Sequence, residues 1–339
     1  MPTTENAADV IGTLQASLAR DGRVALATII ETWGSAPVPV GGQMAIAVDG
    51  SFAGSVSGGC VEGEVISEAM ELLDESGAPK SLSFGVEDET AWRVGLPCGG
   101  KIRVFVERLD GDDGRAYAAL LGNARTRREA LLIETQLATG TRSIYDIDQT
   151  DDPARARRFK TGISSVEAGS TGETFVHARL PPPRVVIIGA THIGQILAEL
   201  VRTTGFAPIV VDPRTAFAAE ARFPGVPLIT DWPQDALPKL GLDPYTAVAA
   251  LAHVGHIDDE ALKLACRADC FYIGALGSRK NHAKRAERLT TAGLSSVEIA
   301  RICSPIGIDL GATTPSEIAL SVMAEILRHL RGAKGKGAA

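Results

Sequence analysis

The 339-residue chain is 45% hydrophobic and 22% charged, which is typical of a soluble globular protein long enough for two domains. Its net charge of −7 argues against a surface built for nucleic acid or an anionic membrane. No apolar run approaches the roughly 20 residues of a membrane-spanning helix, and the polar first residues lack signal-peptide features. Five cysteines in such a chain predict reduced thiols in a cytoplasm.

The first part of the chain, residues 1–180, is expected to form an α+β domain. Its first elements, in order, are a helix over Val10–Leu18, a buried strand over Val24–Ile30, a proline- and glycine-rich loop over Trp33–Gly42, a hairpin over 43–56 and a helix from Val61 toward Gly77. Shaped loops on rigid scaffolds often carry function.

Cys60 is the first candidate functional residue. It follows Ser57, Gly58 and Gly59, and the apolar residues after it recur at helical spacing, so its thiol is predicted at a helix N-terminus. Unpaired N–H groups and the helix dipole there favour anions and lower the pKa of a thiol. Glu62 in the first turn suits the dipole but opposes a thiolate. The alternative is a small, buried, inert cysteine at a tight turn.

A second cysteine, Cys98, is followed by Gly99 and leads into a strand predicted over 102–106. Nearby basic residues would favour its thiolate or an anionic ligand: Arg93, Lys101 and Arg103. We interpret Cys60 and Cys98 as a pair of thiols held by glycine turns. The alternative is two unrelated turns that need glycine for backbone reasons alone.

The rest of the first domain suggests no chemistry. Gly111–Gly114 is expected to be an acidic linker, before a helix over Arg115–Arg127 and strands over 130–137, 141–147 and 174–177. A basic cluster over 155–160 is expected to be a solvated face. Three consecutive prolines, 181–183, mark the expected domain boundary, because they form a stiff extended hinge.

The second domain, residues 184–330, begins with the pattern of a dinucleotide-binding fold. An apolar strand runs into a glycine turn (Gly189, Thr191, His192, Gly194), a helix and a second strand that ends at Asp212. Asp212 follows Gly189 by 23 positions, close to the interval of about 20 in this fold. Thr191 replaces the glycine that lets a pyrophosphate approach the backbone, so NAD(P) is disfavoured although the fold is predicted.

Further strands over 227–229, 246–251 and 271–276 alternate with helices, which predicts a Rossmann-like parallel sheet with helices on both faces. Ligands bind at the carboxyl ends of such strands. The candidate contacts there are the glycine-turn residues together with Asp212, Arg214, Ser278 and Arg279. A final helix over 318–330 precedes a tail, 331–339, that is expected to be disordered.

Two other groups of side chains are expected to have no functional role. His253 and His256 near Asp258 have the residue types of a metal set, but His253 closes a strand, so the two imidazoles do not share a helical face. We therefore predict no metal site made by the protein alone. Cys266 and Cys270 are expected in the core.

Several motifs follow one another along the chain: Gly34-Ser35-Ala36-Pro37, Ser57-Gly58-Gly59-Cys60-Val61-Glu62, Pro97-Cys98-Gly99-Gly100, Gly189…His192…Gly194, Asp212…Arg214, Arg222-Phe223-Pro224, Gly274–Arg279, Ser304–Gly307 and Pro315–Ala319. In this order and spacing they resemble the XdhC/CoxI family, the maturation factors of molybdenum hydroxylases such as xanthine dehydrogenase and CO dehydrogenase. The resemblance covers nearly the whole chain, with residues 111–180 least distinctive.

The resemblance implies a chaperone, rather than a subunit of the finished enzyme, that binds the molybdenum cofactor as molybdopterin or its cytosine dinucleotide form. It implies that a cysteine desulfurase sulfurates the bound cofactor and that an apo molybdenum hydroxylase receives it. Cys60 and Cys98 match the family's cysteines, and the second-domain turn matches its nucleotide-type turn: Gly189, Gly194, Asp212 and Arg214. We also expect a homodimer, because two short loops of one small domain enclose a large cofactor poorly.

Three departures from the family pattern stand out: Val38 after the first loop proline, Thr191 in the glycine turn, and Ala252 and Val254 around His253. They could mark a paralogue that serves a particular hydroxylase. Two other functions stay open on the sequence. One is an NAD(P)-dependent oxidoreductase that uses the second domain, and the other is a scaffold that only bridges the desulfurase and the apo-hydroxylase.

Overall fold

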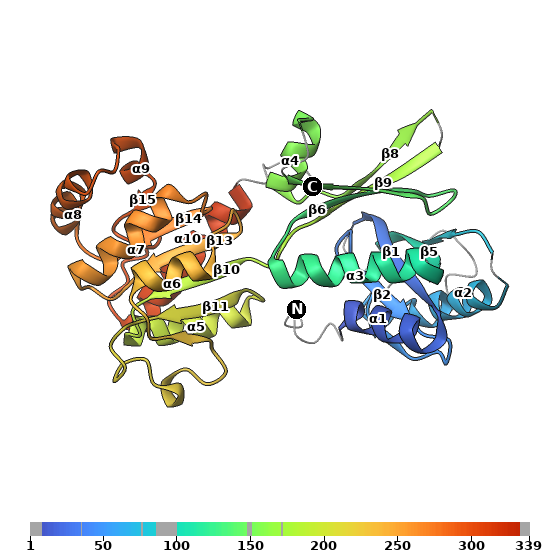
Figure 1. Ribbon diagram of the computed structural model, residues 1–339, viewed down its shortest axis with the longest axis horizontal. Coiled ribbons are helices and arrows are strands. Elements are labelled where there is room, and N and C mark those ends of the chain that lie inside the picture. The colour runs from blue at the N-terminus through green and yellow to red at the C-terminus, as the bar shows by residue number, and fades with distance from the viewer. Residues whose placement is uncertain are drawn as a thin grey trace. The chain divides into compact units, whose positions relative to one another are not determined.

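The computed structural model describes residues 9–34, 36–75, 77–85, 100–147, 151–170 and 172–332. The chain divides into two compact units between Pro181 and Pro182 (Figure 1), and each unit has its own hydrophobic cores. None of the helices in these ranges combines the length and the apolar character that crossing a membrane requires.

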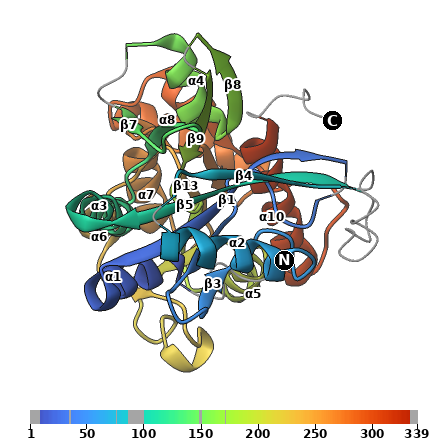
Figure 2. The ribbon, with the colours of Figure 1, turned by 90° about the vertical axis from the view of Figure 1, so that its right-hand side faces the viewer.

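The N-terminal unit is built on a five-stranded antiparallel sheet in the order β3-β2-β1-β5-β4. Its strands are β1 (Arg23–Trp33), β2 (Gln43–Ile46), β3 (Phe52–Gly54), β4 (Lys80–Phe84) and β5 (Lys101–Asp110). Helix α2 (Glu62–Glu75) covers one face (Figure 2), and helices α1 (Val10–Asp21) and α3 (Gly111–Arg127) pack on the other. Alternate residues of β1 therefore face two different cores, which explains why residues 24–30 are buried without interruption.

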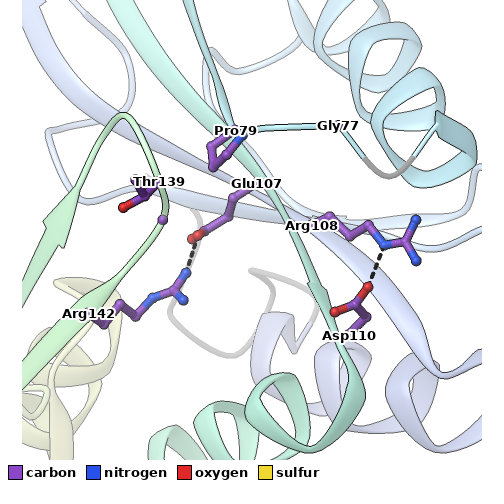
Figure 3. Close-up of a pocket in the computed structure, with 8 residues that line it drawn as sticks. Gly77, Pro79, Glu107, Arg108, Asp110, Thr139 and Arg142 are labelled. Carbon is purple, nitrogen blue, oxygen red and sulfur yellow. Dashed lines mark hydrogen bonds and ion pairs between the residues drawn. The ribbon is translucent and has the colours of Figure 1, made fainter.

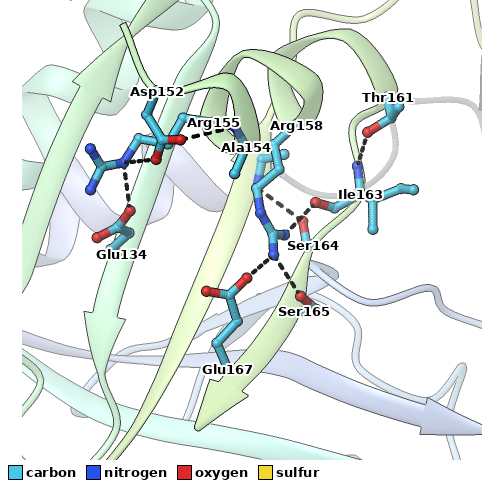
Figure 4. Close-up of polar contacts among 11 residues, drawn as sticks. Glu134, Asp152, Ala154, Arg155, Arg158, Thr161, Ile163, Ser164, Ser165 and Glu167 are labelled. Carbon is cyan, nitrogen blue, oxygen red and sulfur yellow. Dashed lines mark hydrogen bonds and ion pairs between the residues drawn. The ribbon is translucent and has the colours of Figure 1, made fainter. Parts of the chain in front are cut away.

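A second antiparallel sheet completes this unit, in the order β7-β6-β9-β8. Its elements are β6 (Leu131–Gln136), β7 (Arg142–Asp146), helix α4 (Pro153–Thr161), β8 (Ser165–Gly169) and β9 (Gly172–Arg179). Of the basic residues of α4, Arg157 and Lys160 are exposed, as expected of a solvated face, whereas Arg155 and Arg158 are half-buried and paired with acids (Figure 4). Arg155 donates to Glu134 at 2.9 Å, and Arg158 contacts both Ser165 and Glu167.

The expected linker at Gly111–Gly114 is wrong, because these residues form the first turn of α3. Gly114 is buried there, and a Cβ atom on it would lie 3.1 Å from the carbonyl carbon of Leu109 and 3.2 Å from Leu18 Cδ2. The glycine thus serves close packing of the helix against the sheet and α1, not chain flexibility.

The C-terminal unit is a six-stranded, all-parallel sheet in the order β12-β11-β10-β13-β14-β15. The strands are β10 (Arg184–Ile188), β11 (Ala207–Val211), β12 (Leu228–Ile229), β13 (Thr246–Ala250), β14 (Tyr272–Ala275) and β15 (Ile302–Cys303). The helical segments are α5 (His192–Thr203), η2 (Glu220–Arg222), α6 (Pro233–Leu240), α7 (Gly255–Arg267), α8 (Arg279–Thr291), α9 (Ser296–Ala300) and α10 (Pro315–Gly332). This is the strand order of a dinucleotide-binding fold, so the predicted Rossmann-like sheet is confirmed.

Helices cover both faces of this sheet. Val185 and Ile187 of β10 face the core formed with α5 and α10, whereas Val186 and Ile188 face the core formed with α6 and α7. Burial on both faces is what the apolar residues 185–188 of β10 predict for a parallel strand. Cys266 and Cys270 lie in the second of these cores, as expected.

Candidate functional site

Cys60 lies on a loop of the N-terminal unit that joins β3 to α2. Val56 and Val61 anchor the two ends of the loop in the core beneath, while Cys60 is half-buried against the same core. Gly58 and Gly59 have φ angles of 78° and 116°, a left-handed region that side chains disfavour. The predicted glycine turn is confirmed. Cys60 lies two residues before Glu62, the first residue of α2.

The carboxylate of Glu62 organises this loop. It accepts hydrogen bonds from the backbone amides of Val56 (3.2 Å), Ser57 (2.9 Å) and Gly59 (2.9 Å). It also accepts from the Ser55 hydroxyl at 2.6 Å and from the Ser57 hydroxyl. Although burial opposes ionisation, these donors lower the pKa of Glu62 to about 2, so the side chain is an anion at neutral pH.

The remaining amides of the loop are also satisfied by the protein. The Ser57 hydroxyl oxygen accepts from the amides of Cys60 and Val61, each at 2.9 Å. The amide of Gly58 donates to the Ser55 hydroxyl at 2.9 Å. The sequence had suggested unpaired N–H groups beside Cys60 that could bind an anion, and the structure corrects this for residues 56–61 because internal acceptors occupy them.

The proline- and glycine-rich loop predicted to be functional lies beside the Cys60 loop. A Cβ atom on Gly58 would lie 3.6 Å from the ring carbons of Pro37. At its other end this loop rests on β9, because a Cβ atom on Gly41 would lie 2.8 Å from the Nε2 atom of His177. Burial and the nearby Arg179 lower the pKa of His177 to about 3, so this supporting imidazole is neutral at physiological pH.

Cys98 and Gly99 lie outside the described residues. The other described cysteines belong to the C-terminal unit. Burial raises the pKa of Cys266 to about 11, that of Cys270 to about 12 and that of Cys303 to about 11, so all three carry their protons at neutral pH. Cys60 is the described cysteine that lies half-buried on a glycine loop of the N-terminal unit, and we take it as the candidate thiol ligand.

The glycine turn of the C-terminal unit joins β10 to α5. Gly189 has a φ of 109°, and a Cβ atom on it would lie 2.5 Å from the amide nitrogen of Ala252. Gly194 is equally restricted, since its Cβ atom would lie 2.5 Å from the carbonyl oxygen of Gly189. Thr191 caps α5, and its hydroxyl accepts from the amide of Gly194 at 3.2 Å. The threonine thus uses a helix N–H group that a phosphate would need.

Asp212 follows β11 and is fully buried. Its Oδ2 atom accepts from the amide of Ala190 at 2.7 Å and from Arg214 Nη2 at 2.7 Å. Its Oδ1 atom accepts from the amide and from Nε of Arg214, both at 2.9 Å. Burial opposes ionisation, but these hydrogen bonds hold the pKa of Asp212 below its ordinary value. In a dinucleotide site the two carboxylate oxygens of this acid accept hydrogen bonds from a ribose, but here both are already hydrogen-bonded to Ala190 or Arg214.

The other candidate residues of this unit lie on its surface. His192, Ser278 and Arg279 are exposed, at the starts of α5 and α8. Ser278 caps α8 by accepting from the amide of Asn281 at 3.3 Å. Asp258, in the first turn of α7, is instead buried, and burial raises its pKa to about 6. Among the described residues, no group of three or more histidine, cysteine or acidic side chains is arranged to hold a metal ion.

A cavity of about 270 Å³ lies where the two sheets of the N-terminal unit meet (Figure 3). Buried Glu107 of β5 forms an ion pair there with Arg142 of β7, whose guanidinium also lies 4.3 Å from the centre of the Tyr117 ring. Because these charges are paired with each other across the two sheets, we assign the cavity a structural role.

Two important residues were missed or misread from the sequence. Glu62 was interpreted as a residue that suits the helix dipole and opposes a thiolate, and its hydrogen bonds back to Ser57 and Gly59 were not foreseen. Arg222 was noted only as part of a motif. It donates to the carbonyl oxygen of Ala190 and to Gln195, both at 2.8 Å, and so braces the glycine turn from outside.

Comparison with known proteins agrees with this architecture. Residues 17–85 match the model of the XdhC and CoxI family, and residues 185–326 match the XdhC Rossmann domain. The chain is 30% identical to a protein of Bacillus subtilis named as a probable xanthine dehydrogenase subunit, over 93% of this chain and 96% of that protein. It is also 30% identical to the molybdenum cofactor insertion chaperone PaoD of Escherichia coli, over 89% and 81% of the two chains.

A solved structure shares the whole fold. It is described as a xanthine dehydrogenase from Bacillus halodurans and superposes with a TM-score of 0.68 at 25% identity, over 97% of this chain and 98% of that chain. Together with the two family-model matches and the full-length relatives, this places the protein: the chain belongs to the XdhC and CoxI family.

Proposed function

We propose that this protein is a chaperone that binds the molybdenum cofactor and inserts it into an apo molybdenum hydroxylase of the xanthine dehydrogenase class. The relative PaoD, 30% identical, is named a molybdenum cofactor insertion chaperone. The single structural observation that supports the proposal most is the half-exposed Cys60 thiol on a fixed loop at the start of α2. A thiolate is a soft ligand that suits molybdenum.

The surroundings of Cys60 suit a bulky cargo. A Cβ atom on Gly59 or Gly63 would meet no atom within 4 Å in the part of the chain that the structure describes, so neither glycine on the two sides of Cys60 is packed against another part of the protein. The loop itself is held by Glu62 and Ser57 and does not need the cargo to form. The loop's contribution is thus to bind and orient the cargo.

The finer parts of the proposal follow from the family. We propose that the cargo is molybdopterin or its cytosine dinucleotide form, that a cysteine desulfurase sulfurates it on this protein, and that the protein acts in the cytoplasm as a homodimer. The remaining candidate contacts belong to the same proposal: Ser57, Gly58, Gly59, Cys98, Gly99, Gly189, Thr191, His192, Gly194, Asp212, Arg214, Ser278 and Arg279. Among these, the inward-facing Asp212 is best assigned to holding the glycine turn.

The proposal is tested by transfer. Protein loaded with molybdenum cofactor is mixed with the cofactor-free hydroxylase of the same cell, and hydroxylase activity is followed. We expect the wild-type protein to activate the hydroxylase and the Cys60→Ser variant, loaded under the same conditions, to fail. Activation by wild type and variant alike would remove Cys60 from the mechanism, and no activation by either would contradict the function.

A further inference from the structure

We infer that Glu62 is the positioning residue of the Cys60 loop: its carboxylate occupies the place that a bound anion would take, so the loop binds its ligand through sulfur and not through a phosphate. The inference rests on the proposed function, because it concerns how the same site recognises the cargo.

The backbone amides of residues 56–61 are all hydrogen-bonded within the protein. Each of the six consecutive amides from Val56 to Val61 donates to an oxygen atom of Glu62, Ser57 or Ser55. A loop of glycines before a helix, with converging N–H groups, is the usual cradle for a phosphate. Here a carboxylate of the same chain already fills that cradle, and its charge would repel a second anion.

Glu62 is connected to Cys60 through the hydroxyl group of Ser57. The Ser57 hydroxyl donates to the Glu62 carboxylate, and the same oxygen accepts from the amide of Cys60 at 2.9 Å. Ser57 is 1% exposed and Glu62 is 8% exposed, so solvent does not compete for these bonds. The position of Cys60 is therefore fixed through Ser57 by a buried anion two residues further along the chain.

The sulfur atom and the buried carboxylate of this loop decide which part of the cargo it can bind. A loop that presents a sulfur atom beside a buried negative charge favours a metal centre of soft character over an anionic group. The phosphate of a pterin cofactor must then contact other residues, and the loop contributes specificity for the metal end of the cargo. Changing Glu62 should therefore affect retention of the metal while leaving the rest of the protein folded.

The test uses the full chain with Glu62→Ala, Glu62→Gln and, as a matched control, Glu64→Ala, an exposed acid in the same turn of α2. Hydrogen exchange of the amides of residues 56–61 is measured without cofactor. We expect exchange at least about tenfold faster in Glu62→Ala, a smaller increase in Glu62→Gln, and no change in Glu64→Ala, since several charge-assisted bonds are lost only in the first two.

Rescue separates positioning from a general loss of structure. Added formate or acetate should re-enter the emptied cradle of Glu62→Ala and slow the exchange of the same amides, with no effect on wild type. Molybdenum retention should fall at least about tenfold in Glu62→Ala and recover with formate, while inorganic phosphate should bind to that variant and not to wild type.

Two results would overturn the inference. One is wild-type protection of the loop amides in Glu62→Ala, and the other is full molybdenum retention by this variant despite unprotected amides. If wild-type protein retains no cofactor, the proposed function fails, but the exchange and rescue measurements still decide the role of Glu62.

Discussion

The carboxylate of Asp212 accepts a hydrogen bond from the backbone amide of Ala190 at 2.7 Å, which turns the acidic residue at the end of β11 inward onto the glycine turn. In nicotinamide enzymes of this fold the equivalent acid binds the ribose. Here Arg214 takes the remaining hydrogen-bonding positions of the carboxylate, so the fold of a dinucleotide site is present while its ribose contact is used for structure.

We therefore predict no tight binding of nicotinamide cofactors. Isothermal titration with NAD(H) and NADP(H) should give no saturable heat at micromolar concentrations, because Thr191 and Asp212 both use groups that the dinucleotide needs. Low-micromolar binding of either would favour the oxidoreductase alternative.

The glycine turn should tolerate no side chain at Gly189. In Gly189→Ala the new Cβ atom would lie 2.5 Å from the backbone of Ala252, where no flexible side chain can yield. We expect a loss of several kcal/mol in the free energy of unfolding, on the order of 3 or more. Gly293→Ala is the control, because its φ of 89° is also left-handed but its Cβ atom would meet nothing within 4 Å. Equal losses measured by urea unfolding would refute the steric argument.

Asp258 should give the C-terminal unit a characteristic pH dependence. Burial raises its pKa to about 6 from an ordinary value of 3.8, so the folded state holds a proton that the unfolded state has released between these pH values. The free energy of unfolding therefore falls as pH rises through this window and is constant above it. Relative to Asp258→Asn, wild type should lose about 2 kcal/mol between pH 4 and pH 7, measured by urea unfolding across pH. A constant difference would show that Asp258 does not titrate there.

The ion pair between Glu107 and Arg142, which joins the two sheets of the N-terminal unit, should contribute to the free energy of unfolding. Glu107→Gln leaves the guanidinium of Arg142 buried without its counter-charge, which costs about 3–5 kcal/mol. Replacing both, as Glu107→Gln with Arg142→Met, should restore part of this loss. If the single variant unfolds at the wild-type urea concentration, the pair is not structural.

The sequence predicted the elements whose residues obey one strong pattern. After Arg184, strand β10 is apolar because both faces are buried, and the glycine turn and Asp212 follow it at the spacing of the fold. Helix α4 was not predicted, because it is short and rich in arginine and buries only Phe159 and Thr161. Its position depends on ion pairs with distant strands, such as that of Arg155 with Glu134, which local sequence does not reveal.

In the candidate site, too, local sequence predicted one residue and not the contacts that hold it. Cys60 at a helix start was predictable from glycines followed by helical periodicity, and the structure places it there. The role of Glu62 was not predictable in this way, because it depends on the path of the chain from Ser55 to Gly59 bringing amides around one carboxylate. A charged residue in a first helical turn looks the same in sequence whether it faces solvent, as Glu64 does, or closes a loop.

The molybdenum content of freshly purified protein tests the central claim most directly. Wild type, Cys60→Ser and Cys303→Ser are produced in cells that make the cofactor, and metal is measured by elemental analysis with the released pterin identified by mass spectrometry. The account predicts molybdenum with a pterin on wild type and on Cys303→Ser, and its loss from Cys60→Ser with the fold unchanged by circular dichroism. Equal molybdenum on wild type and Cys60→Ser would contradict it.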